Sequence, residues 1–300
     1  MKKINIAIVG YGNIGKGVYE AVSASPDMNL AGVVLRDVST AQAKGVPAGV
    51  TVAGNISGLG QVDVALLCIP SRSVEETAIS LLSQGIHTVD SYDIHGDIYD
   101  MQQRLAKIGK ANKSVAIIAA GWDPGTDSMM RAILEAAAPK GLTYTNFGPG
   151  MSMGHTVVAK AIPGVKNALS VTIPTGTGLH RRMVYIQPDP GADFAKVTAD
   201  IKADPYFSKD DTHVIKADDI NALMDKGHGV NLVRKGVSGT TDNQLFEFNM
   251  RINNPALTAQ IMVSSARAAT RKEAGCYTLI EIPIIDMLPG GREAIIRRLV

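Results

Sequence analysis

A glycine motif directly follows an apolar run near the start of the chain, and it limits the possible folds more than any other segment. Residues 4–9, INIAIV, are rich in β-branched side chains, which predicts a strand that is buried on both faces. The motif has the pattern G-x-G-x-x-G and consists of Gly10, Tyr11, Gly12, Asn13, Ile14 and Gly15. Between a strand and a helix, its glycines permit a tight turn, close approach of a phosphate, and close packing of the helix. We therefore expect these residues to bind the pyrophosphate of a dinucleotide at a helix N-terminus.

Residues 1–120 alternate between short apolar runs and amphipathic stretches. Strands are expected at 30–36, 62–68, 87–90 and 115–119, and helices at 71–84 and 98–112. The glycine-rich segment 45–60 is expected to be a loop around a short strand. Strands that alternate with helices over short connections indicate an α/β fold with a Rossmann-type, doubly wound parallel sheet.

The pattern changes after residue 120. Strands are expected at 143–147, 169–173, 183–187, 230–235 and 245–252, and helices at 126–138 and 255–272. Apolar and polar residues alternate along segment 245–252, so one face of that strand is expected to contact solvent or a partner. We expect residues 121–276 to form a second, α+β domain with a mixed, largely antiparallel sheet for substrate binding and dimerisation. The dinucleotide domain, 1–120, is completed by about 277–300, which ends in a short amphipathic helix at 292–299.

Composition and charge exclude several classes of protein. Thirty basic and 28 acidic side chains give a net charge of +2, without the basic stripe that nucleic acid would require. No apolar run approaches the ~18 residues of a membrane span. The first apolar run continues into the glycine motif rather than ending as a signal peptide, and Cys68 and Cys276 form no metal or disulfide pattern. These features favour a cytoplasmic protein.

The end of the second strand bears on which dinucleotide binds. An enzyme that uses NAD usually places an acidic residue there, on the ribose 2′-hydroxyl. Here Leu35 occupies that position and Arg36 follows, whose forked donors suit a 2′-phosphate. We therefore expect NADP. Two alternatives stay open: Arg36 is a solvated strand end, or Asp37 contacts the ribose after a shift of one residue.

Ligands of a doubly wound sheet bind beyond the carboxyl ends of its strands. The end of the strand expected at 62–68, and the turn that follows it, carry the residues expected near a nicotinamide. They are Cys68, Pro70, Ser71 and Ser73. The next two ends bring carboxylates close to the only tryptophan, Trp122; these are Asp90, Asp93, Asp123 and Asp127. Such a group suits a cationic substrate and could accept a proton. Helix capping is the alternative, most of all for Asp127.

The second region supplies side chains suited to carboxylates. His180, Arg181 and Arg182 form a local cationic cluster, and Thr172, His228 and Asn254 are polar residues near predicted strands or the long helix. Taken singly, each has a structural alternative; Asn254, for example, could cap the helix. The six histidines are scattered without metal-ligand spacing, so no metal is expected, and no G-x-S-x-G motif supports serine hydrolase chemistry.

Several segments together resemble one family, meso-diaminopimelate dehydrogenase. They are GYGNIG at 10–15, CIPSRSVEE at 68–76, HTVDSYDIHGD at 87–97, AGWDPGTDS at 120–128, TNFGPGMSMGH at 145–155, MDKGHGV at 224–230 and RINNPALTAQ at 251–260. The resemblance implies NADP-dependent, reversible oxidative deamination of meso-2,6-diaminopimelate at its D-configured centre. The products would be L-2-amino-6-oxopimelate, ammonia and NADPH, and the enzyme would be a homodimer.

The resemblance also implies roles for individual residues. Asp93 and Asp123 match carboxylates around the reacting amino group, and Trp122 and Phe147 match its walls. Met153 and Gly154 match a loop that closes over that end. The distal L-centre would be held by Thr172, Arg182, His228 and Asn254. Some relatives carry an arginine pair where this chain has Leu35 and Arg36, which bears on the strength of NADP preference.

Two other functions compete with this one. The first is another two-domain NADP-dependent reductase of amino-acid biosynthesis, such as homoserine dehydrogenase. The second is a non-catalytic NADP-binding sensor. The joint presence of Asp93, Trp122 and Asp123 favours catalysis, because a sensor needs only the glycine motif.

Overall fold

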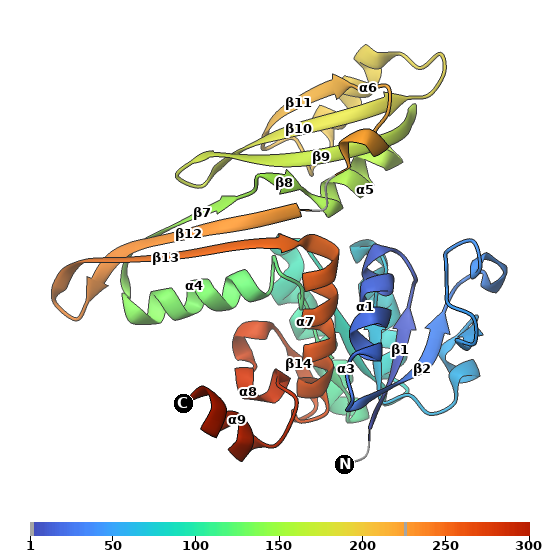
Figure 1. The fold of residues 1–300 in the computed structure, drawn as a ribbon, viewed down its shortest axis with the longest axis vertical. Helices are drawn as coiled ribbons and strands as arrows, with labels where there is room; N and C mark the ends of the chain where they lie inside the picture. The colour runs from blue at the N-terminus through green and yellow to red at the C-terminus, as the bar shows by residue number, and fades with distance from the viewer. Residues whose placement is uncertain (1–2, 225–226) are drawn as a thin grey trace. The chain divides into compact units, whose positions relative to one another are not determined.

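The computed structural model describes residues 3–224 and 227–300, which form two compact units (Figure 1). The first unit contains Met1–Met129 and Pro255–Val300, and the second contains Met130–Asn254. Asp225 and Lys226, inside the motif at 224–230, lie outside the described residues. The units differ from the expected boundaries, because residues 121–129 and 255–276 group with the first unit.

The first unit is built on one parallel sheet of seven strands in the order β14-β6-β5-β4-β1-β2-β3. Its strands are β1 (Ile4–Val9), β2 (Met28–Val34), β3 (Val52–Ala53), β4 (Val64–Leu67), β5 (His87–Asp90), β6 (Val115–Ile117) and β14 (Gly275–Tyr277). The expected doubly wound sheet is thus confirmed. The second strand ends at Val34, so Leu35 and Arg36 lie beyond it rather than within it. The edge strand β14 comes from the far end of the chain.

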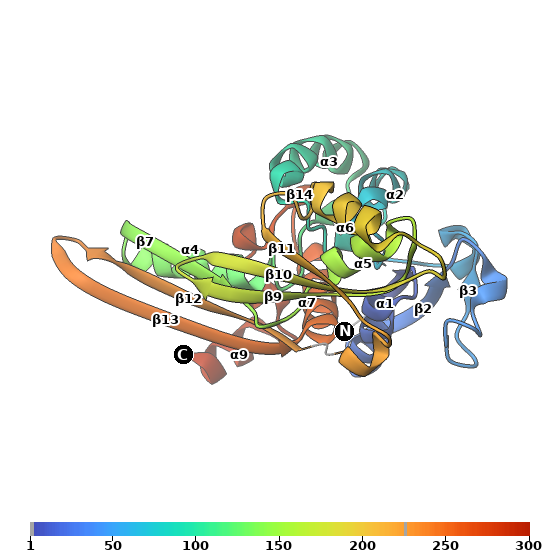
Figure 2. The ribbon, with the colours of Figure 1, turned by 90° about the horizontal axis from the view of Figure 1, so that it is seen from above.

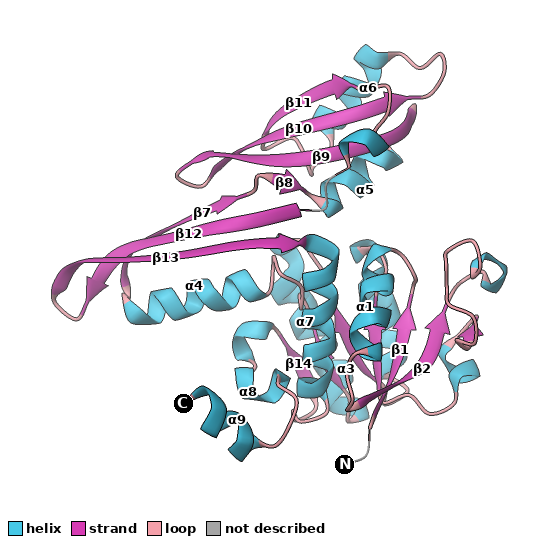
Figure 3. Ribbon diagram, in the orientation of Figure 1, coloured by secondary structure: helices cyan, strands magenta, loops and turns pink. Residues whose placement is uncertain are grey.

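Helices cover both faces of this sheet (Figure 3). Ile6 and Ile8 of β1 share a core with α1 (Asn13–Ser23) and α7 (Asn254–Ala269), whereas Ala7 shares one with α2 (Val74–Leu82) and α3 (Ile98–Asn112). Gly17 lets α1 and α7 approach closely, since an added Cβ there would lie 2.9 Å from Ala259 Cβ. The core contribution of α7 explains why the first unit extends past residue 255.

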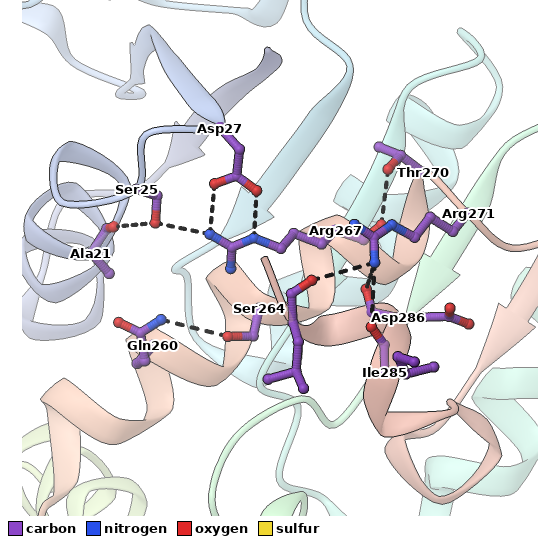
Figure 4. Close-up of polar contacts among 11 residues, drawn as sticks. Ala21, Ser25, Asp27, Gln260, Ser264, Arg267, Thr270, Arg271, Ile285 and Asp286 are labelled. Atoms are coloured by element: carbon purple, nitrogen blue, oxygen red, sulfur yellow. Dashed lines mark hydrogen bonds and ion pairs between the residues drawn. The ribbon is translucent and has the colours of Figure 1, made fainter. Parts of the chain in front are cut away.

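A buried arginine fixes α7 to the first unit (Figure 4). The Arg267 guanidinium donates to both oxygens of Asp27, from Nε at 2.7 Å and from Nη2 at 2.8 Å, and to Ser25 Oγ at 3.1 Å. These hydrogen bonds lower the pKa of Asp27. Arg271, one turn later, donates to the carbonyl oxygens of Ile285 and Asp286. The C-terminal segment therefore belongs to the first unit through polar contacts as well as through β14.

The second unit has two sheets, whose long strands are seen from above in Figure 2. One is antiparallel, in the order β13-β12-β7, and contains β7 (Lys140–Phe147), β12 (Gly227–Ser238) and β13 (Thr241–Asn253). The other has the order β11-β10-β9-β8 and contains β8 (Gly150–Met151), β9 (Val165–Gly176), β10 (Leu179–Pro188) and β11 (Asp211–Lys216). Only its β10–β11 pair is parallel. The expected mixed, largely antiparallel arrangement is confirmed, as is the alternation along β13.

The remaining helices are α4 (Thr126–Ala137), α5 (Met153–Ala161), α6 (Phe194–Ala203), α8 (Ile284–Met287) and α9 (Arg292–Leu299). A buried cluster joins α5 and α6 to the four-stranded sheet; it includes Ala159, Val184, Ile186, Val197 and Ile201. Neither α5 nor α6 was expected from the sequence. Across residues 3–224 and 227–300, every helix is too short or too polar to cross a lipid bilayer.

Candidate active site

The glycine motif forms the turn between β1 and α1 and fits a dinucleotide. Gly10 has a φ of +89°, and an added Cβ would lie 2.5 Å from the Cys68 carbonyl oxygen. A Cβ at Gly15 would lie 2.4 Å from the Gly10 oxygen, whereas nothing lies within 4 Å of one at Gly12. Gly12 caps α1 without a side-chain hydrogen bond, so the first amides of the helix are left to an anion. The open face above Gly12 is where a pyrophosphate would lie.

Beyond β2, Asp37 has a local structural role. Its Oδ1 accepts hydrogen bonds from the Ser39 amide at 3.0 Å and the Ser39 hydroxyl at 2.6 Å, which cap the short 3-10 turn Val38–Thr40. The Arg36 side chain is exposed. Asp37 thus has a structural role that requires no contact with a ribose. Arg36 is accessible to a 2′-phosphate.

The ends of β4 and β5 meet through a side-chain pair. Ser71 opens the 3-10 turn Ser71–Ser73, which replaces the first turn of the helix expected at 71–84. Its hydroxyl donates to Asp93 Oδ1 at 2.6 Å, and the Asp93 amide donates back to Ser71 Oγ at 3.4 Å. Burial raises the pKa of the Cys68 thiol, so this residue acts as packing beside Gly10 rather than as a thiolate. The structure thus joins a residue expected at the cofactor to a candidate catalytic carboxylate.

The carboxylates at the strand ends fall into two kinds. Asp93 and Asp123 are partly exposed, whereas Asp90 and Asp127 are buried. The loop that carries Asp123 folds back on itself, because the amides of Thr126 and Asp127 donate to the carbonyl oxygens of Gly121 and Trp122. Of these four carboxylates, Asp93 and Asp123 are therefore the two that a substrate could reach, as their expected role requires.

In the second unit, Thr172 and Arg182 are register partners on β9 and β10. Arg182 Nη1 donates to Thr172 Oγ1, and Nε donates to Asp210 Oδ2 at 2.5 Å. The Arg182 side chain is 16% exposed. Arg181 points away, with Nε 2.7 Å from Asp211 Oδ2, as the alternation of a strand requires. The expected three-residue cationic cluster is therefore wrong: its members lie on opposite faces.

Two histidines near Arg182 are held neutral. Burial, and after it the Arg182 charge, lowers the pKa of His180; its Nε2 accepts from the Phe147 amide at 2.8 Å. Burial also lowers the pKa of His228 to about 4, and the Gly229 amide donates to its Nδ1 at 2.8 Å. Arg182 is consequently the positive charge of this group, and the imidazoles offer neutral polar atoms.

Glycines place the segment that leads to Met153 and Gly154. Gly148 has a φ of +95°, and an added Cβ would lie 2.3 Å from the Thr172 oxygen; one at Gly150 would lie 2.2 Å from the Gly227 oxygen. The chain thus passes closely between β9 and β12. Met153 and Gly154 form the first turn of α5, so the expectation that they lie in a loop is wrong.

Asn254 begins α7 and is buried; its Nδ2 donates to the Met151 carbonyl oxygen at 3.4 Å. Sequence reasoning missed Asp210 and His155, which surround Arg182. His155 bonds to Ser152 Oγ and to the Tyr206 carbonyl oxygen, and its Nε2 lies 4.0 Å from Asp210 Oδ2. Asp210 carries no motif, and only the register of β10 and β11 brings it to the site.

Comparison with known proteins decides the family. Residues 4–116 match the oxidoreductase family with an NAD-binding Rossmann fold, and residues 121–181 match the diaminopimelic acid dehydrogenase C-terminal domain. The meso-diaminopimelate D-dehydrogenase of Bacteroides fragilis is 59% identical over 303 residues, which cover 100% of both chains. This chain belongs to the meso-diaminopimelate D-dehydrogenase family.

Solved structures agree with membership of the meso-diaminopimelate D-dehydrogenase family. The C. glutamicum DAP dehydrogenase in complex with DAP superposes with a TM-score of 0.89 at 29% identity, over 100% of both chains. An engineered D-amino acid dehydrogenase bound to NADP+ superposes with a TM-score of 0.88 at 28% identity, again over 100% of both chains. The family fold thus extends over the whole chain.

Proposed function

We propose that this chain catalyses the NADP-dependent, reversible oxidative deamination of meso-2,6-diaminopimelate at its D-configured centre. The products are L-2-amino-6-oxopimelate, ammonia and NADPH. The observation that carries the proposal is the 59% identity, over the full length of both chains, to the Bacteroides fragilis enzyme. The glycine turn, the two accessible carboxylates and the Arg182 guanidinium are the chemical groups that this reaction needs.

The first unit holds the cofactor. The amides that follow Gly12 bind the pyrophosphate, and Arg36 binds the 2′-phosphate. Side chains after the end of β4 would border a bound nicotinamide; these are Cys68, Pro70, Ser71 and Ser73. When bound, NADP accepts the hydride that leaves the D-configured carbon.

Asp93 and Asp123 act on the reacting amino group. The amine must be neutral before hydride can leave, so one of these carboxylates accepts a proton from the ammonium, directly or through water. Ser71 holds Asp93 in one orientation, and the closed loop 121–125 holds Asp123. Trp122, which is 5% exposed, supplies an apolar wall beside Asp123, and the family resemblance gives Phe147 the role of a further wall residue.

The second unit binds the far end of the substrate and carries the dimerisation surface. The Arg182 guanidinium pairs with the distal carboxylate, while Thr172, neutral His228 and Asn254 complete the polar contacts. Met153 and Gly154 border this site from the start of α5. Because one end of a nearly symmetric substrate is fixed, only the other centre reaches the catalytic carboxylates.

We propose the assembly from the family resemblance and the location from the two cysteines. The protein forms a homodimer, as the family resemblance implies, and the exposed side chains that alternate along β13 offer it a surface. Both cysteines are free, as they are in the reducing cytoplasm, where we place the reaction.

The test is NADPH formation at alkaline pH with meso-diaminopimelate. The L,L isomer, D-alanine and a reaction with NAD alone are run in parallel. We expect turnover with the meso isomer and NADP, and none with the L,L isomer. A protein that binds NADP without turning over the meso isomer would instead be another reductase of amino-acid biosynthesis or a sensor.

A further inference from the structure

Asp90 is a fully buried carboxyl group that the proposed chemistry does not use. It is the last residue of β5, and its Oδ1 accepts hydrogen bonds from the Tyr92 amide at 2.9 Å and the Ala119 amide at 3.1 Å. Its own carbonyl oxygen accepts from the Ala120 amide at 2.7 Å. One residue therefore bonds to the chain after β5 and to the chain after β6.

Those two chain segments carry the candidate catalytic carboxylates. Tyr92 immediately precedes Asp93, while Ala119 and Ala120 lead into the loop that presents Asp123. Ala119 has a φ of +54°, a left-handed conformation that costs an alanine free energy, so its amide needs a partner that holds it. The Asp90 carboxyl supplies that partner.

We infer that Asp90 is a positioning residue that sets the spacing of Asp93 and Asp123 by bonding to both of their loops. The inference rests on the proposed function, in which those two carboxylates act on the amine. Asp90 touches neither substrate nor cofactor in this scheme. It acts through the backbone of Tyr92, Ala119 and Ala120.

The nature of the side chain supports a role beyond packing. Oδ2 of Asp90 has no hydrogen-bond partner within the described residues, so burial of this group costs free energy that an apolar side chain would avoid. The same burial raises the pKa of Asp90 to about 7. A residue present only to fill the core would be apolar, like its neighbour Val89, whereas Asp90 has an acceptor between two loops.

Two substitutions at Asp90 and one at Val89 test the inference. Asp90→Ala removes the acceptor, and Asp90→Asn keeps an oxygen for both amides. Val89→Ala disturbs the same strand without removing a side-chain hydrogen bond to either loop. We expect kcat for meso-diaminopimelate to fall about 30-fold in Asp90→Ala, since small misplacements of catalytic groups are costly. Asp90→Asn should stay within about threefold of wild type, because it retains the hydrogen bonds.

Binding constants and thermal stability separate positioning from a structural role. The Kd of Asp90→Ala for NADP, measured by fluorescence titration, should equal that of wild type, because Gly10–Gly15 bind the pyrophosphate independently. Val89→Ala should lower the Tm while kcat at 25 °C stays unchanged. Equal losses of kcat in Asp90→Ala and Val89→Ala, or full kcat in a folded Asp90→Ala, would overturn the inference.

Amide exchange in the wild-type protein gives a test that needs no variant. The Tyr92 and Ala119 amides should exchange slowly, as amides bonded to a buried carboxyl do. Exchange at the rate of an unstructured peptide would overturn the inference even if Asp90→Ala did not fold. If the wild-type enzyme failed to turn over meso-diaminopimelate, the proposed function would fail, whereas slow exchange of both amides would still establish Asp90 as the anchor of the two loops.

Discussion

Ser71 donates its hydroxyl hydrogen to Asp93, with 2.6 Å between Oγ and Oδ1. The two residues follow different strands, β4 and β5, which are neighbours in the sheet. From its position in the sequence, Ser71 is expected to contact the cofactor. We propose that its hydrogen bond gives it a second role, which is to hold the carboxylate proposed to act on the substrate amine.

Ser71→Ala separates these roles. If Ser71 mainly orients Asp93, kcat for meso-diaminopimelate falls about tenfold and the KM for NADP changes little. Steady-state kinetics with each substrate varied in turn measures both values. Ser83→Ala, at the end of α2, is the control and should match wild type. A raised KM for NADP with normal kcat would show that Ser71 contacts the cofactor and does not orient Asp93.

Arg182→Lys tests the distal site. Lysine keeps the charge but loses the planar guanidinium that bonds to Thr172 and Asp210. The KM for meso-diaminopimelate should therefore rise by about 10- to 100-fold, with a smaller change in kcat. Arg181→Lys is a matched control on the opposite face of β10, where kinetics should not change. Wild-type kinetics in Arg182→Lys would show that another residue binds the far carboxylate.

Arg36→Ala tests the choice of cofactor. Removal of the guanidinium should raise the KM for NADP about tenfold or more and leave the KM for NAD nearly unchanged, because only NADP has the 2′-phosphate. The two cofactors are compared on the same preparation. A parallel change in both values would mean that Arg36 does not contact the 2′-phosphate.

Stability should depend on pH through His155. Burial, and then the Arg182 charge, lowers the pKa of His155 from 6.5 to about 4, so the folded protein keeps it neutral while the unfolded chain binds a proton below pH 6.5. The free energy of unfolding is therefore highest above pH 6.5 and falls as the pH drops toward 4. His155→Gln should reduce this slope by up to about 1.4 kcal/mol per pH unit. Urea titrations at pH 7 and pH 5 measure it, and an unchanged slope would contradict the assignment.

Strong periodicity made parts of the fold predictable. The boundaries of β5, α3 and α9 agree with the expected ranges, and β1 was set by a β-branched run against a glycine turn. α5 was missed because it follows the Gly148–Gly150 turn without a clear amphipathic pattern, and its place depends on packing against β9 and β10. The two-residue strand β8 exists only because the long strand β9 pairs with it, and the three-residue strand β14 forms only where β6, equally short, lies beside it in the sheet.

In the candidate site, too, some residues were predictable from the sequence, whereas their contacts depend on the folded structure. Sequence reasoning named Thr172 and Arg182 separately, and only the register of β9 and β10 makes them a bonded pair. The neutrality of His228 depends on burial and on the Arg182 charge, neither of which spacing reveals. Asp210 could not be found, because it lies in a loop without a motif and meets Arg182 through strand pairing.

The edge strand β14 and the helix α7 affect the order in which the protein can be made. Both belong to the unit that contains the first residues of the chain, whereas the two sheets of the second unit use only residues between 130 and 254. During synthesis, residues 130–254 can form both of their sheets before strand β14 has been made. The sheet of the first unit is still incomplete at that stage, although its first strands were synthesised earlier. The nucleotide-binding turn leaves the ribosome first, yet its supporting core is completed last.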